Sequence, residues 1–82
     1  MSTAIELRTD PNSCLNKVRS TEPLFLLRAQ DKFAAPCIEL WIALTEAAMH
    51  AGEGSPGLAA KLREARSLLR AMERWPTKKV PD

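Results

Sequence analysis

The residues of this chain best suited to chemistry are a guanidinium, an amide and a carboxylate within four positions of each other. Arg28, Gln30 and Asp31 stand where a short apolar run ends and a helical pattern begins. Such junctions are common ligand sites because exposed backbone donors and charged side chains meet there. The same residues fit a structural clasp, in which Arg28 pairs with Asp31 and Gln30 ties down the loop. Two interpretations stay open, a site for a small anion such as a nucleotide and a clasp.

A second charged group lies near the carboxyl end, where four arginines recur at helical spacing: Arg63, Arg66, Arg70 and Arg74. Residues 61–82 carry seven Lys/Arg against three Asp/Glu, or +4, whereas residues 1–60 carry five against seven, or −2. A basic face of this kind can contact the phosphates of a nucleic acid or an acidic protein surface. Glu64 and Glu73 stand among the arginines and favour the other interpretation, a solvated helix face.

The remaining reactive residues indicate neither a metal site nor a catalytic centre. Cys14 and Cys37 form no Cys-x-x-Cys pair and have no histidine cluster beside them, so we expect free thiols rather than zinc ligands or a redox motif. The single histidine, His50, suits a helix end and has no nucleophile near it. Residues 52–57 match G-x-G-x-x-G, but a helical pattern precedes them instead of a strand. We therefore expect no cofactor, no metal and no enzymatic activity.

The element that must position these residues is a helix over residues 35–51 that is apolar on nearly all sides. Such a helix must be covered nearly all round, and a chain of 82 residues has little else to cover it with. The sequence therefore predicts self-association into a homodimer or a higher symmetric oligomer. The expected core and subunit contact consist of large apolar side chains: Leu24, Leu26, Ile38, Trp41, Ile42, Leu44 and Met49.

A second helix, over residues 56–75, is predicted to pack against the first as an antiparallel hairpin. Gly52 suits a left-handed helix cap, and Ser55 before Pro56 reads as an N-cap followed by a proline at the first helical position. A connection this short makes the two helices antiparallel. The packing seam is formed by apolar residues at alternating spacings of four and three: Leu58, Leu62, Ala65, Leu69 and Met72.

A strand is predicted over residues 23–29, because its side chains alternate between two mainly apolar faces. It would pair with residues 4–8 or with its copy in a second subunit. Asp31 then stands where the N-cap of the long helix belongs, although Pro36 can move the first turn to residues 34–36.

Residues 1–22 are expected to be loosely structured. Ala4–Arg8 alternates like a strand, Pro11–Arg19 suits a short helix or a loop, and residues 77–82 form a polar tail with no packing signal. The expected fold is mainly α: a short strand followed by an antiparallel two-helix hairpin, with a short N-terminal strand or helix, completed by oligomerisation.

Composition excludes several classes of protein. The chain is 45% hydrophobic and 27% charged, as in ordinary globular domains. Charged residues interrupt every apolar stretch before it reaches the roughly 20 residues of a membrane-spanning helix. The first residues lack the basic and apolar regions of a secretory signal, so we expect a cytoplasmic protein with no membrane partner.

Residues 22–52, with the segment LRAQDKFA followed by Trp41, resemble small uncharacterised proteins encoded in phage and other mobile-element genomes. The resemblance carries over no catalytic residue. It implies an accessory protein that binds and inhibits or modulates a host factor. We therefore expect a small, non-enzymatic, oligomeric binding protein. The alternatives are binding or sequestration of a small anionic ligand at the Arg28, Gln30 and Asp31 junction, and nucleic-acid binding through the basic second helix.

Overall fold

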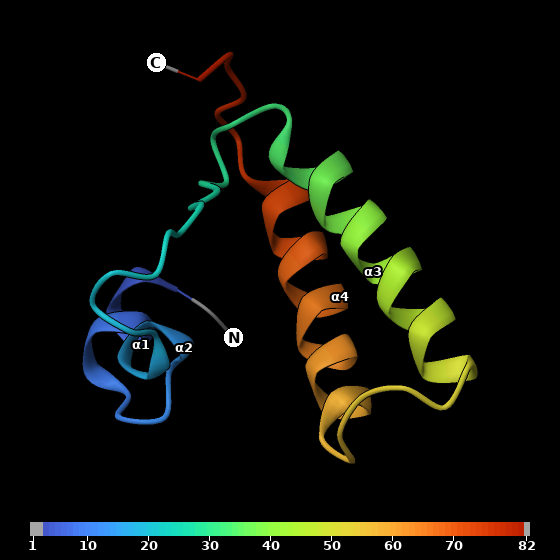
Figure 1. Ribbon diagram of the computed structural model, residues 1–82. Helices are drawn as coiled ribbons and strands as arrows, with labels where there is room; N and C mark the ends of the chain where they lie inside the picture. Colours follow the sequence, from blue (N-terminus) through green and yellow to red (C-terminus); the bar gives the residue numbers. More distant parts are fainter. Residues whose placement is uncertain (1–2, 82) are drawn as a thin grey trace.

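The computed structural model describes residues 3–81 and consists of two pairs of helices (Figure 1). At the amino end, α1 (Ala4–Thr9) packs against the single-turn α2 (Cys14–Lys17). At the carboxyl end, α3 (Ala34–His50) packs against α4 (Leu58–Arg74) as the predicted antiparallel hairpin. The prediction of a mainly helical chain with a packed helix pair is thus confirmed.

The hairpin turn begins with the left-handed cap that the sequence predicts. Gly52 has a φ of +81°, a conformation that costs glycine little because it has no Cβ. Its N–H donates to the carbonyl of Met49 at 3.0 Å, and the N–H of Glu53 donates to the carbonyl of Ala48 at 3.0 Å. These two bonds satisfy carbonyls that the end of α3 would otherwise leave without partners.

The start of α4 lies two residues later than expected. Its N-cap is Gly57, and Ser55 with Pro56 belongs to the preceding turn, in which the carbonyl of Ser55 accepts the N–H of Leu58 at 3.1 Å. α3 begins at Ala34, which confirms the alternative that Pro36 moves the first turn to residues 34–36, where its missing N–H breaks no helical bond.

Two strand predictions differ from the structure. Ala4–Arg8 is wrong as a strand, since these residues lie in α1, where Thr3 is the N-cap and its Oγ1 accepts the N–H of Glu6 at 3.3 Å. Residues 23–29 are not in a strand either. A strand needs a hydrogen-bonded neighbour, and the expected partner segment is helical. In residues 3–81 the only β-type pairing is an isolated parallel bridge between Asp31 and Lys79.

The buried core of the described chain lies entirely within the hairpin and is small: Ala34, Ile42, Leu62 and Met72. Of the residues predicted to form core and subunit contact, Ile42 is buried and Ile38 and Met49 are half-buried. The other four are exposed in the single chain: Leu24, Leu26, Trp41 and Leu44. The subunit contact assigned to them stays a prediction.

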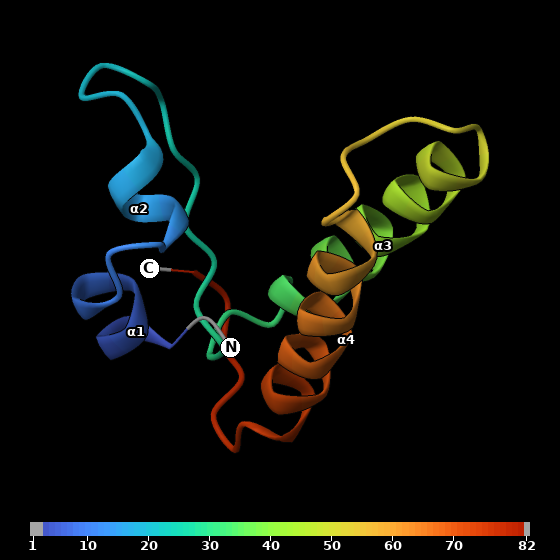
Figure 2. The same cartoon turned by 90° about the horizontal axis from the view of Figure 1, so that it is seen from below.

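The chain is more open than most proteins of its length. Its radius of gyration is 13.7 Å, and about 11.7 Å is typical of 82 residues. Its accessible surface is 6457 Å², and a folded monomer of this size averages about 4,900 Å². Figure 2 shows the cause, because α1 and α2 lie to one side of the hairpin and residues 18–33 reach across to it.

Candidate functional site

The carboxyl end of the chain returns to the segment just before α3. The N–H of Lys79 donates to the carbonyl of Gln30 at 2.8 Å, and the N–H of Lys32 donates to the carbonyl of Lys79 at 2.9 Å. These bonds form the parallel bridge between Asp31 and Lys79. Residues that are almost fifty positions apart therefore form one site, next to the start of α3 (Figure 1).

Lys78 joins the same junction to the end of α4. Its ammonium donates to the carbonyl of Ala29 at 3.2 Å and to the carbonyl of Met72 in the last turn of α4. Lysine is favoured at such a position because the carbonyls at a helix C-terminus carry partial negative charge. Residues 77–82 offered no packing signal in the sequence, and these contacts are made by backbone groups and a charged side chain instead of apolar surface.

Asp31 makes a turn before α3 and is not its N-cap, which is Phe33. One carboxylate oxygen of Asp31 accepts the N–H of Phe33 at 2.8 Å, and its carbonyl accepts the N–H of Ala34 at 3.0 Å. Such side-chain turns compete with capping by aspartate. The carboxylate is thus already bonded to backbone, and no ion pair between it and Arg28 is found in the described chain.

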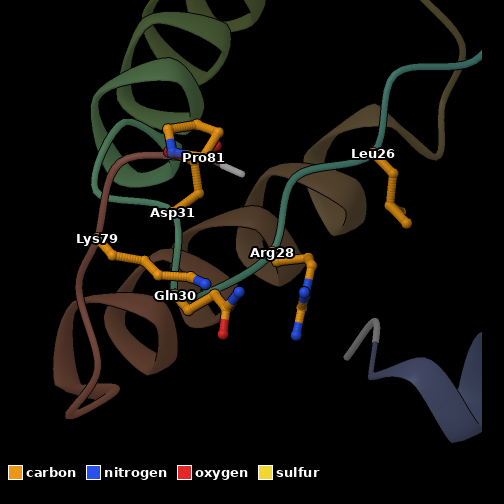
Figure 3. Close-up of a pocket in the computed structure, with 6 residues that line it drawn as sticks. All are labelled: Leu26, Arg28, Gln30, Asp31, Lys79 and Pro81. Atoms are coloured by element: carbon orange, nitrogen blue, oxygen red, sulfur yellow. The ribbon is translucent and has the colours of Figure 1, made fainter.

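The three predicted site residues line one open hollow of about 230 Å³ (Figure 3). Arg28, Gln30 and Asp31 share it with Leu26, Lys79 and Pro81. In Figure 3 the side chains of Arg28 and Gln30 extend on the same side of the backbone, and that of Lys79 runs toward Gln30. Two cationic side chains and an amide suit an anion. Lys79 and Pro81 were missed by the sequence reasoning, because nothing in their composition indicated that the tail would return here.

A larger and more apolar groove, of about 450 Å³, lies where α1 and the extended segment face α4. We call it the α4 groove, and its main walls are Leu7, Leu27, Leu68, Met72 and Trp75. Leu68 and Trp75 lie on the flank of α4 outside its predicted packing seam, which is the only sequence signal for the groove. Its lining resembles the apolar centre of a protein interface, with Arg28 at the margin.

The basic face of α4 is partly neutralised by the hairpin. Arg66 forms an ion pair with Glu46 of α3, and both side chains are about half exposed. Arg63, Arg70 and Arg74 are exposed and share one side of the helix, since they are spaced by seven and four. Of the four arginines, Arg66 is engaged in an ion pair within the described chain, so the basic face offers fewer available guanidinium groups than the sequence indicates.

The other reactive residues stay apart. Cys14 and Cys37 are free and exposed, and His50 is exposed at the end of α3. Within residues 3–81, no three His, Cys, Asp or Glu side chains gather as metal ligands. The helices of this part of the chain are too short or too polar to cross a membrane.

Comparison with protein-family models, with curated proteins and with solved structures finds no match for this chain. No role can therefore be transferred from a relative. The most unusual surfaces of the molecule are apolar: the α4 groove and the exposed large hydrophobic side chains.

Proposed function

We propose that this chain is a small, non-enzymatic binding protein that assembles with copies of itself and occupies an apolar surface of another macromolecule. The supporting observation is the distribution of large apolar side chains in residues 3–81. Four hydrophobic residues are buried, whereas eleven large ones are exposed. Extended apolar surface on a folded chain marks an interaction site, because exposing it to water is unfavourable.

The amount of surface supports the same proposal. The chain exposes roughly 1,500 Å² more than a monomer of its mass averages. A standard protein interface takes about 800 Å² from each partner. The excess is therefore close to the area of two such contacts, one between copies and a second with a different protein.

The α4 groove is the surface that we assign to the different protein. It combines leucines, a methionine and Trp75 with Arg28 at its edge, and aromatic residues and arginine carry much of the binding energy at interfaces. The resemblance of residues 22–52 to phage and mobile-element proteins makes a host protein the expected partner, with inhibition or modulation as the outcome.

The test is capture of a host protein by the immobilised chain and by two variants. Leu26→Glu places a carboxylate in the wall of the α4 groove, and Val80→Glu places one at an exposed apolar position outside it. We expect a discrete partner to be retained by the wild type and by Val80→Glu, and to be lost with Leu26→Glu. Equal retention by all three chains, or retention of nothing, would count against the proposal.

A second candidate function is binding of a small anion, favoured by the hollow that Arg28 and Gln30 share with Lys79. A thermal-shift series with inorganic phosphate and nucleoside phosphates would then show a rise in Tm that grows with ligand concentration. Arg28→Ala should remove the rise. Arg63→Ala, which changes an exposed arginine outside the hollow, should keep it, and a rise that survives Arg28→Ala would exclude this site.

A further inference from the structure

α3 carries two apolar stripes, and the hairpin covers only one of them. The covered stripe packs on α4 and contains Ile38, Ile42 and Met49. The second stripe follows positions spaced by three and four along the helix, as in a helix-packing seam. It faces away from α4 except at its margin, where Trp41 and Ile38 line a hollow with α4 residues such as Lys61 and Glu64. We call it the outer face of α3 and define it by these residues: Cys37, Leu40, Trp41, Leu44, Ala47, Ala48 and Ala51.

The outer face is strongly exposed in the single chain. The exposed fractions are 61% for Leu40, 63% for Leu44 and 45% for Trp41. It also carries no charge. At 100° per residue, the polar side chains Glu39 and Glu46 lie on the opposite side of the helix, and Glu46 is engaged with Arg66 there. A solvated helix face needs polar side chains, as α4 has, so the outer face is built to be covered.

Bulky and small residues are unevenly distributed along the outer face. Its first half carries Leu40, Trp41 and Leu44, and its second half carries only alanines, at positions 47, 48 and 51. If two such faces met in parallel, leucine would oppose leucine and alanine would oppose alanine, which leaves voids at one end. In the antiparallel arrangement each bulky half lies over a flat half, and the contact can be close-packed.

We propose that a second copy of this chain covers the outer face, with the two α3 helices antiparallel about a two-fold axis at Leu44. This inference rests on the self-assembly in the proposed function and names its surface. An uncharged, self-complementary stripe suits an isologous contact, because the same residues must face each other in both copies. The chain as a whole has a surface excess of roughly 1,500 Å², to which the separation of α1 and α2 from the hairpin contributes, and a standard interface takes about 800 Å² from each partner.

The first experiment measures mass in solution by light scattering and sedimentation. The wild type should be a dimer at micromolar concentration. Leu44→Glu should raise the dissociation constant at least about 100-fold, because two unpaired carboxylates would be buried at the axis. Leu15→Glu, at an exposed leucine on α2, should stay dimeric. A wild type that is monomeric at 50 µM, or a dimer that Leu26→Glu breaks and Leu44→Glu does not, would overturn the inference.

The second experiment tests orientation by disulfide formation in a Cys14→Ser background. With the axis at Leu44, the two Cys37 residues lie about 21 Å apart along the helices, too far to be bridged. Adding Ala51→Cys places a second thiol opposite Cys37 of the other copy. We therefore expect covalent dimers only after this addition. Rapid cross-linking through Cys37 alone would show a parallel pair and contradict the proposal.

The two proposals can fail separately. Host-protein capture that is lost with Leu26→Glu, in a chain that is monomeric, would sustain the partner contact at the α4 groove and overturn both the dimer and the self-assembly in the proposed function. A dimer broken by Leu44→Glu that captures no partner would sustain the dimer and count against the binding function. Far-UV circular dichroism on each variant confirms that helix content is kept, so that loss of folding is not read as loss of assembly.

Discussion

At the scale of single residues, Asp31 decides how the chain enters α3. Its carboxylate bonds the N–H of Phe33, and its backbone is bridged to Lys79. Asp31→Ala should lower the free energy of unfolding by about 1 kcal/mol, because one backbone donor at the helix start loses its partner. Asp31→Asn keeps an oxygen at the same place and should cost less than half as much. Urea denaturation followed by circular dichroism measures both, and equal losses would show that the charge matters and the turn does not.

Leu62 is the largest side chain that the fold encloses completely, with 1% of its surface exposed. Leu62→Ala should lower the free energy of unfolding by about 2–5 kcal/mol, because apolar burial is lost and a cavity is left between the two helices. A domain of this length is stable by only about 4–12 kcal/mol, so the loss should appear as a large drop in the urea midpoint. Leu15→Ala, at an exposed leucine, serves as the control and should change stability by less than about 0.5 kcal/mol.

The candidate site was predictable in part. Arg28, Gln30 and Asp31 do gather at one hollow, because they are neighbours in sequence at a point where the chain turns. The contribution of Lys78 and Lys79 was not predictable. Lys79 makes backbone hydrogen bonds, which any residue except proline can donate, and Lys78 donates through its ammonium. No hydrophobic pattern predicts either contact. Contacts of this kind depend on where α4 ends in space.

At the scale of elements, the three glycines of the hairpin turn allow a matched series. Gly52→Ala should cost about 1 kcal/mol from its φ of +81° alone, since nothing lies within 4 Å of an added Cβ. Gly54→Ala should cost more, because its φ is +91° and the new Cβ would lie 2.5 Å from the Leu58 side chain. Gly57→Ala has a negative φ, and its new Cβ would make only an ordinary contact of 3.9 Å with Ser55 Oγ, so it should be neutral or slightly stabilising. Urea titration ranks the three, and any other order would contradict this account.

The long elements were predictable and the short ones were not. Seventeen-residue helices carry several turns of periodic pattern and a stop signal, Gly52 after α3 and Pro76 after α4, so both helices are predicted to within two residues. In Ala4–Thr9 the alternation of Ile5 and Leu7 outweighed a competing signal, Thr3 followed by Glu6, which has the spacing of a helix-capping box. Residues 23–29 are not a strand in the single chain, and one of their two predicted partners, residues 4–8, is helical. Pairing is a property of two segments and cannot be predicted from one.

At the scale of the whole molecule, the chain is held together by the hairpin and by the carboxyl-terminal residues, more than by its amino end. Every buried hydrophobic residue of the described chain is in the hairpin. In that same part, α1 and α2 pack on each other and not directly on α3 or α4. The carboxyl-terminal residues, in contrast, bond the segment that leads into α3. We therefore expect the carboxyl terminus to support the hairpin more than the amino terminus does.

A pair of truncations tests this distribution of stability. A chain that begins at Pro23 loses α1 and α2 but no buried residue, so its free energy of unfolding should fall by at most about 1 kcal/mol. A chain that ends at Pro76 loses far fewer residues but all the contacts of Lys78 and Lys79 with residues 29–32. Its free energy of unfolding should fall by about 1–3 kcal/mol, because two backbone hydrogen bonds and one charge-assisted hydrogen bond are lost.

Urea denaturation of both truncated chains and the full chain, at one protein concentration so that assembly is equal, supplies the comparison. The chain that ends at Pro76 should have the lower free energy of unfolding, although it loses fewer residues. If the chain that begins at Pro23 is the less stable of the two, then α1 and the wall of the α4 groove stabilise the hairpin through Leu7 and Leu27. The groove would then belong to the core of the protein, and it could not be the free surface that a partner occupies.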